Sequence, residues 1–393
     1  MRLRTHLLLW VVVPLLTVLL FGRGISNASG TASDWQVVPS PNPSATNNSL
    51  SAVAALSPGN VWAVGWTTEG PLIEHWNGTA WKVVSNPGPS GGSLNGIFAV
   101  SKNDIWAVGS VYSGSGPRQT LIEHWNGTKW SVIFSPAAGT LNAVTAAAAN
   151  EVWAVGSNYD MASNTNQVVI EHWEGKGWKV VSGVNPATGD NMLSGVAAIT
   201  AHDVWAVGHS TSAAAGSAVP NTVPNPSTQT LVEHWNGVQW SAITSPSPAT
   251  ATNMLNAVAA VSSNDVWAVG QQAPQGEGPQ QTLIERWNGH AWKVVKSPNA
   301  GLAGGVLKGV AVVNKDNVWA VGVSAEFQTS TSFRTLIEHW NGRSWQIDPS
   351  PNVGSSGSIL FAVTRIPLTE KLWAVGYYNT PSVFLRTLTE YSD

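Results

Sequence analysis

The tetrapeptide Trp-Ala-Val-Gly occurs seven times in the 393-residue chain and constrains the fold more than any other feature. The six intervals between copies average about 52 residues, a period typical of β-propeller blades. The copies begin at Trp62, Trp106, Trp153, Trp205, Trp267, Trp319 and Trp373. A unit of this size cannot bury its apolar faces alone, so the repeats must pack on one another.

Each repeat contains four short apolar segments, which we name strands a to d in chain order. They are typified by LNAVAAV for a, DVWAVG for b, TLIEHW for c and WKVV for d. The turn between c and d is mostly Asn-Gly, the strongest short signal for a β-hairpin. This pattern predicts an all-β chain folded as a seven-bladed β-propeller of four-stranded antiparallel blades.

The two ends of the chain make the same prediction independently. The seventh repeat stops after strand c, at LTEYSD, and has no strand d. Residues 35–38, WQVV, form a strand d that no repeat precedes. We therefore expect residues 35–38 to join the C-terminal blade and close the ring of a propeller spanning residues 35–393, which removes exposed sheet edges.

The sizes of the side chains predict the radial order of the strands. Strand a is rich in Ala, Gly and Val, whereas most of the 22 tryptophans lie on b, c and d. Blades converge at the axis, so strand a should be innermost and strand d outermost. The glycine of each Trp-Ala-Val-Gly is expected to end strand b and begin the next loop.

Residues 1–28 have the pattern of a signal peptide or an N-terminal membrane anchor. Arg2 and Arg4 precede an apolar run over residues 7–21, which is short for a membrane span, and small residues follow. Residues 29–34 would be a short linker. In either case we expect an extracytoplasmic protein, secreted or anchored at the outer face of the membrane.

Composition excludes several function classes. The net charge is −3, only 10% of residues are charged, and no Lys/Arg run occurs, so a nucleic-acid partner is not expected. The absence of cysteine excludes disulfides, Cys-ligated metals and a thiol nucleophile. We expect no cofactor, no metal and a monomer, with membrane contact only through residues 7–21 if they are retained.

The repeat DVWAVG…LIEHWNGTAWKVV resembles the kelch repeat, in which a strand ends in glycine and a tryptophan opens the fourth strand. It is more similar still to the tryptophan-rich VWAVG…HWNG.W repeats of exported bacterial proteins. The resemblance covers residues 35–391 and implies a propeller fold, while activity is left open because one fold hosts many functions.

A glutamate recurs on every strand c and is usually followed by histidine, as in LIEHW. A catalytic pair is needed once, whereas seven copies around a ring cannot converge on one substrate. We interpret these glutamates as buried braces that accept hydrogen bonds from an indole, a backbone amide or the neighbouring imidazole. They are Glu74, Glu123, Glu171, Glu233, Glu285, Glu338 and Glu390. One histidine per blade lacks the spacing of a metal site.

The b–c and d–a loops should share one end of the propeller, and they vary widely, whereas the a–b and c–d turns are short and uniform. Variable loops on a rigid frame are the usual location of recognition. Candidate ligand-binding residues there are Trp66, Tyr112, Arg118, Tyr159, Asp160, His209, Glu326, Phe327, Arg334, Tyr377, Tyr378 and Arg386, with Arg365 at a pore mouth.

These features favour a non-catalytic binding module for a polar ligand such as a glycan, peptide or protein. No catalytic residue can be assigned. The alternative is a glycosidase- or lyase-like enzyme on the same loop face, for which Arg118, Arg334, Arg386 and Tyr377 are conceivable site residues. A third hypothesis is a surface structural or adhesion component.

Overall fold

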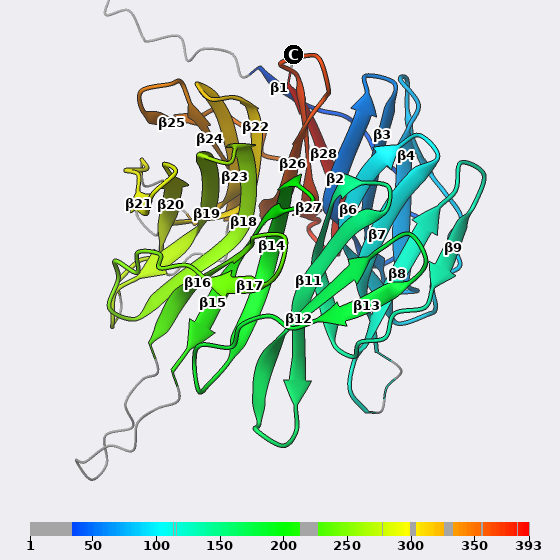
Figure 1. Ribbon diagram of the computed structural model, residues 1–393. Coiled ribbons are helices and arrows are strands. Elements are labelled where there is room, and N and C mark those ends of the chain that lie inside the picture. The colour runs from blue at the N-terminus through cyan, green and yellow to red at the C-terminus, as the bar shows by residue number, and fades with distance from the viewer. Residues whose placement is uncertain are drawn as a thin grey trace, which may run out of the picture. The chain divides into compact units, whose positions relative to one another are not determined.

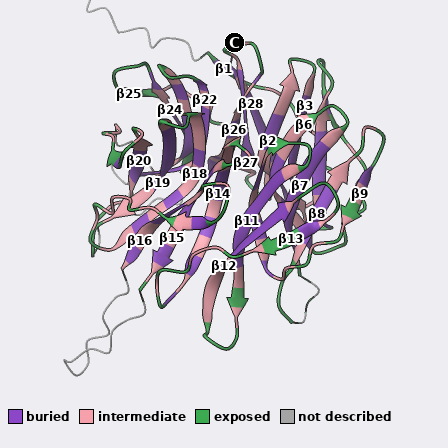
Figure 2. Ribbon diagram, in the orientation of Figure 1, coloured by how far each residue is buried: buried purple, intermediate pink, exposed green. Residues whose placement is uncertain are grey.

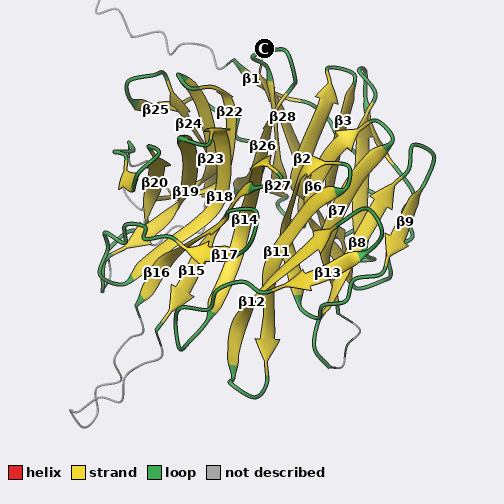
Figure 3. Ribbon diagram, viewed as in Figure 1, coloured by secondary structure: helices red, strands yellow, loops and turns green. Residues whose placement is uncertain are grey.

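The computed structural model confirms the seven-bladed propeller, with seven sheets of four antiparallel strands and no helix among the residues it describes (Figure 3). It describes residues 34–112, 114, 116–212, 227–276, 278–298, 304–325, 333–354, 357–382 and 384–392. In this part of the chain nothing forms a helix long and apolar enough to span a bilayer. Residues 1–28 and the linker up to residue 33 lie outside the described part.

Blades 1 to 7 each contain one strand of every class. The a strands are β2 (Asn48–Ser57), β6 (Gly92–Ser101), β10 (Thr140–Ala148), β14 (Asn191–Thr200), β18 (Thr252–Ser262), β22 (Gly305–Asn314) and β26 (Ser358–Arg365). The b strands are β3 (Asn60–Thr67), β7 (Asp104–Val111), β11 (Glu151–Asp160), β15 (Asp203–Thr211), β19 (Asp265–Ala273), β23 (Asn317–Ala325) and β27 (Leu372–Asn379). The c strands are β4 (Pro71–Trp76), β8 (Gln119–Trp125), β12 (Thr165–Trp173), β16 (Thr228–Trp235), β20 (Gln281–Trp287), β24 (Phe333–Trp340) and β28 (Leu385–Ser392). The d strands are β5 (Trp81–Val83), β9 (Trp130–Ile133), β13 (Trp178–Val181), β17 (Trp240–Ala242), β21 (Trp292–Val294), β25 (Trp345–Asp348) and, for blade 7, β1 (Trp35–Val37).

The ring closes as the sequence predicts. Strand β1 pairs antiparallel with β28, with Trp35 opposite Ser392, and the amide of Val38 adds a hydrogen bond to the carbonyl of Thr389 (Figure 1). Each a strand contacts the a strands of both neighbouring blades, so the a strands are innermost. Exposed residues gather on the outer strands and at the turns, whereas strands a to c carry most of the buried ones, together with the tryptophan that opens each strand d (Figure 2).

The glycine of Trp-Ala-Val-Gly does not end strand b, contrary to the sequence-based expectation. In β11, for example, the strand continues through Gly156 to Asp160. A Cβ atom placed on Gly156 would lie 1.9 Å from the carbonyl oxygen of Thr140 on the paired strand a, and the other six blades show the same close approach. The glycine is therefore needed because two backbones meet there, next to a bulge in strand a.

Tryptophans hold neighbouring blades together. In six blades the strand b tryptophan packs against aromatic residues of strands c and d of the next blade, as Trp106 does against Trp173 and Trp178 at ring-centroid distances of 4.9 and 5.3 Å. At the seam between blades 6 and 7 the strand b tryptophan packs against the closing strand d, with Trp319 5.7 Å from Trp35 between ring centroids. Buried indoles in edge-to-face geometry contribute both area burial and aromatic pairing.

All seven strand c glutamates are completely buried. Four of them accept a hydrogen bond from the serine that follows strand d of the preceding blade, as Glu338 does from Ser297 at 2.7 Å. The Glu233 carboxylate accepts the amide of Val184 instead. Serine hydroxyls, rather than the indole and imidazole donors that we expected, therefore supply most of these contacts. Burial raises the pKa of Glu338 to about 7 and that of Glu390 to about 8.

In five blades a histidine follows the glutamate, and this histidine contacts strand b of its own blade rather than the preceding blade. Its ring lies against the strand b tryptophan of its own blade, as in the Trp205–His234 pair at 4.2 Å, and its Nε2 atom is 2.8 Å from Asp203 at the start of strand b. In blade 5 an arginine occupies this position, and Arg286 makes two hydrogen bonds to Asp265. These groups fix the pairing of strands b and c within a blade.

Candidate binding site

A bulge in every strand a turns one side chain toward the axis of the propeller. The register with strand b shifts just after a leucine, for example between Leu141 and Ala143 of β10, so that Asn142 is the extra residue. The close backbone approach at Gly156 lies directly beside this shift. The equivalent residues of the seven blades, which we call the waist residues, are Ser51, Asn95, Asn142, Ser194, Asn256, Lys308 and Phe361.

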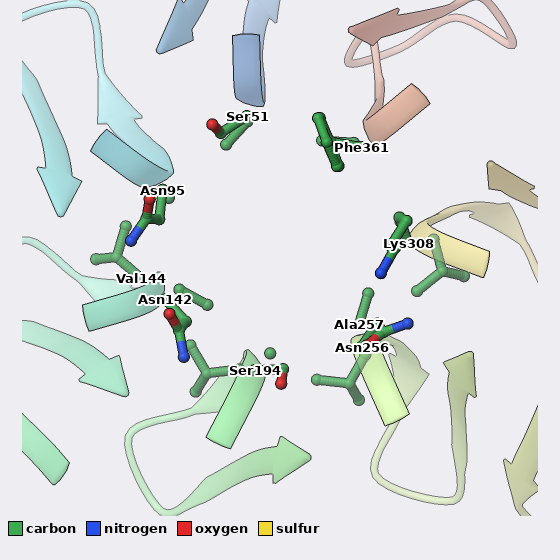
Figure 4. Close-up of a pocket in the computed structure, with 18 of the residues that line it drawn as sticks. Ser51, Asn95, Asn142, Val144, Ser194, Asn256, Ala257, Lys308 and Phe361 are labelled. Carbon is green, nitrogen blue, oxygen red and sulfur yellow. The ribbon is translucent and has the colours of Figure 1, made fainter. Parts of the chain in front are cut away.

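The waist residues surround an open axial space (Figure 4). They line two hollows together: an inner one of about 200 Å³ and an outer one of about 450 Å³. The inner hollow is otherwise lined by Ala, Gly, Val and Ile of the a strands, and the outer one by residues that include Trp66 and Tyr377. We call the two hollows together the axial funnel. Its outer part has the size of a small-molecule site.

Three asparagines of the waist clamp the next blade. The Nδ2 atoms of Asn95, Asn142 and Asn256 donate to the carbonyl oxygens of Leu141, Leu193 and Leu307 at 3.0, 2.7 and 2.7 Å. Each clamp fixes the orientation of its carboxamide, since one end is held by the neighbouring strand. All three side chains line the funnel, and the Oδ1 atom of each is a hydrogen-bond acceptor.

Lys308 is the one charged group among the seven waist residues, and its side chain lies in the lining of the ring between Phe361 and Asn256 (Figure 4). Burial lowers the pKa of Lys308 below its ordinary value. No carboxylate lines either hollow in the described part of the chain. The funnel therefore carries a positive charge that is partly desolvated, a setting in which electrostatic interactions with a ligand are strong.

Aromatic rings stand on one side of the funnel. Phe361 and Tyr377 of blade 7 lie 5.7 Å apart between ring centroids, and Trp66 of blade 1 lines the same outer hollow. All three are half-buried. Burial raises the pKa of the Tyr377 hydroxyl, and this hydroxyl is a hydrogen-bond donor at neutral pH, as an ordinary tyrosine is.

Several predicted site residues come together beside the funnel. Trp66, Tyr112 and Arg118 line a hollow of about 400 Å³ between blades 1 and 2, and Arg118 and Tyr159 line another of about 420 Å³. The Arg118 guanidinium lies over the Tyr112 ring at 5.6 Å. Because these hollows contain residues of both b–c and d–a loops, the two loop classes do meet at one end of the propeller.

Other predicted residues form hydrogen bonds with nearby backbone groups. Arg386 donates to the carbonyls of Ser44, Ala45 and Thr46, and Asp160 accepts from the amides of Ala162 and Ser163.

Arg365 donates to the carbonyls of Thr369 and Val313, which joins blades 6 and 7. Tyr378 packs against the core between the same two blades. Burial lowers the pKa of His209, while nearby Asp190 acts in the opposite direction. Arg334 is exposed at the start of β24. Glu326 and Phe327 lie outside the described residues.

Sequence reasoning missed all seven waist residues. They occupy a position that varies in polarity inside an otherwise uniform pattern, Leu-x-[Ala/Gly]-[Val/Ile], and this variability is the signal that could have identified them. In the described part of the chain no group of three or more His, Asp or Glu side chains could hold a metal ion.

No protein-family model and no curated protein sequence matches the chain. Solved structures that are similar in fold include the WD40 β-propeller domain of Doa1, with 10% identity, 92% of this chain and 97% of that chain covered, and a TM-score of 0.56. YCF48 bound to a D1 peptide has 13% identity, coverage of 92% and 96%, and a TM-score of 0.55.

A third similar structure is an ulvan lyase of polysaccharide lyase family PL25 bound to a saccharide of glucuronate and sulfated rhamnose. It has 11% identity, coverage of 85% of this chain and 90% of that chain, and a TM-score of 0.53. Identities this low show a shared fold alone. They establish no activity for this chain.

Proposed function

We propose that the protein is an exported binding module that holds a polar ligand, a glycan, peptide or protein, in the axial funnel. The observation that carries the proposal is the bulge that every blade places beside the axis. It delivers a ring of hydroxyl, carboxamide and ammonium groups to one space, on strands rather than on loops. Polar groups on a rigid frame around a hollow of ligand size are the ordinary design of a binding site.

The fold neighbours support the kind of partner. One of them is bound to a peptide and another to an acidic saccharide, so this architecture accommodates both ligand classes. Export is supported by the apolar run over residues 7–21 behind two arginines. The variable loops beside the funnel, with Trp66, Tyr112, Arg118 and Tyr159, would extend the contact surface.

The test is to fill the funnel and measure binding to glycan and peptide arrays. Ser194→Phe places at blade 4 the side chain that blade 7 already carries at Phe361, so the fold should tolerate it. The matched control is Ser344→Phe, at an exposed position in the c–d turn at the other end of a blade. We expect the full-length protein and the control to bind the same ligand, and Ser194→Phe to lose it.

Unchanged binding by a folded Ser194→Phe variant would place the site elsewhere. The bound ligand should also be recovered unmodified after long incubation. Conversion of the ligand into product would favour the enzyme alternative on the same face.

A further inference from the structure

The funnel has a charge that its own residues do not balance. Lys308 projects from β22 at the waist, and burial disfavours its charged form without any described acidic group acting on it. A cation held in this way is stabilised by an anion that arrives with the ligand. The ligand should therefore carry a negative group that reaches the axis.

The rest of the waist suits hydroxyl groups. The three clamped asparagines present Oδ1 acceptors, and Ser51 and Ser194 each add a hydroxyl that can donate or accept. Such a ring can satisfy several ligand hydroxyls at once. A simple inorganic anion would leave most of these groups without a ligand partner.

The aromatic side of the funnel suits the apolar face of a sugar ring. Phe361 is the waist residue that follows Lys308 around the ring, and Tyr377 lies next to it, 5.7 Å away between ring centroids. A pyranose carboxylate at Lys308 would thus lie close to a surface on which its C–H groups can pack. Aromatic side chains combine a large apolar surface with little loss of conformational freedom.

An extended peptide is favoured less. Peptides commonly bind a sheet edge through its main-chain groups. At the inner edge, the carbonyls of Leu141, Leu193 and Leu307 already accept the side-chain amides of the asparagine clamps. Side-chain groups, rather than free backbone, are what the waist offers.

We propose that the ligand is an acidic glycan, with one uronic acid residue in the funnel, its carboxylate on Lys308 Nζ and its hydroxyls on the asparagine and serine side chains. This deepens the proposed function and rests on the funnel being the binding site.

The experiment measures binding by calorimetry to tetrasaccharides of galacturonate, glucuronate and mannuronate, each beside its carboxyl-reduced neutral form. We expect the full-length protein to bind at least one uronate at least about tenfold more tightly than its neutral form, as a charge-assisted hydrogen bond implies. Lys308→Met should remove that difference, and Lys308→Arg should retain most of it. Lys293→Met, at an exposed position on β21, is the matched control and should behave as the parent protein.

The outcomes separate the two proposals. Equal binding of the acidic and neutral forms, blocked by Ser194→Phe, would overturn the uronate proposal and leave the funnel as the site. Binding of a hexaglutamate peptide but of no saccharide would overturn the glycan class. Saccharide binding that survives Ser194→Phe would overturn both. A melting temperature for Lys308→Met close to that of the parent protein confirms that loss of affinity is not loss of fold.

Discussion

The hydroxyl of Ser135 on blade 2 donates a hydrogen bond to the buried carboxyl of Glu171 on blade 3, with 2.6 Å between Oγ and Oε1. Equivalent serines join blades 4 to 5, 5 to 6 and 6 to 7. Tryptophan clusters occur at the same seams. Adjacent blades therefore contact each other through apolar tryptophan packing, which has little directionality, and through serine–glutamate hydrogen bonds, which fix the position of one blade relative to the next.

Loss of this hydrogen bond should destabilise the fold without affecting a ligand. Ser135→Ala leaves a buried acceptor without its donor, which should lower the free energy of unfolding by about 1–3 kcal/mol. Urea denaturation of Ser135→Ala, Glu171→Gln and the double variant measures the coupling, which should exceed about 0.5 kcal/mol. Ser131→Ala on β9 is the control and should be close to neutral. Additive effects of the two substitutions would contradict a direct bond.

The buried glutamates should make the protein less stable as the pH rises. Burial raises the pKa of Glu285 to about 7 and that of Glu390 to about 8, from an ordinary value of 4.5. Below pH 4.5 both the folded and the unfolded states carry the proton, so stability is greatest there. Above it the unfolded chain releases protons that the folded state retains, and the free energy of unfolding falls until about pH 8.

Urea midpoints across this range check the sign. Glu390→Gln should flatten the curve because it removes one of the titrating groups. Glu370→Gln, at an exposed site, should leave the slope unchanged. A protein that becomes more stable between pH 5 and 8 would show that other groups dominate its titration.

Replacing the glycine of Trp-Ala-Val-Gly should lower the free energy of unfolding more than replacing any other small residue. A Cβ at position 322 would lie 2.0 Å from the carbonyl oxygen of Val306, so Gly322→Ala must displace β22 from β23. We expect a loss of about 3 kcal/mol and weaker ligand binding, because Lys308 follows the displaced backbone. Gly177→Ala, where a Cβ meets nothing within 4 Å, should be nearly neutral. Thermal unfolding of both variants provides the comparison.

The first residue of strand b is asparagine in some blades and aspartate in others, so the chain itself shows which of the two each partner accepts. Asn60 and Asn317 occupy this position opposite histidine, accepting from His75 and His339 at 2.9 and 3.0 Å. Asp203→Asn should therefore change the free energy of unfolding by less than about 0.5 kcal/mol. Asp265→Asn removes a two-point contact with Arg286 and should cost about 1–2 kcal/mol. Equal effects in a denaturation assay would mean that the arginine pair has no special role.

The fold could be predicted because its determinants are local and repeated. Strand length, the Asn-Gly turn and the tryptophan spacing can all be recognised within one repeat. The strand d at residues 35–38, which no repeat precedes, predicted how the ring closes. Each of these signals depends on residues adjacent in the chain or on their count.

The site could not be predicted in the same way. Asn142 lies inside a strand pattern, and only the bulge next to the close approach of Gly156 and Thr140 turns it to the axis. The donor to Glu171 comes from Ser135, on another blade. A serine does recur shortly after each strand d, but its spacing alone does not show that it reaches the glutamate of the next blade. Arg386, on β28, was conspicuous by its charge, but it donates hydrogen bonds to carbonyls of the loop between β1 and β2.

The pairing of β1 with β28 has a consequence for how the protein is made. The Thr389 hydroxyl donates a hydrogen bond to the Val38 carbonyl, a residue 351 positions earlier. During synthesis the edge of β1 therefore stays unpaired until β28 has emerged from the ribosome. Such remote contacts slow folding. A nascent chain from which β28 has not yet emerged leaves β1 without its partner, while the other six blades already contain all four of their strands.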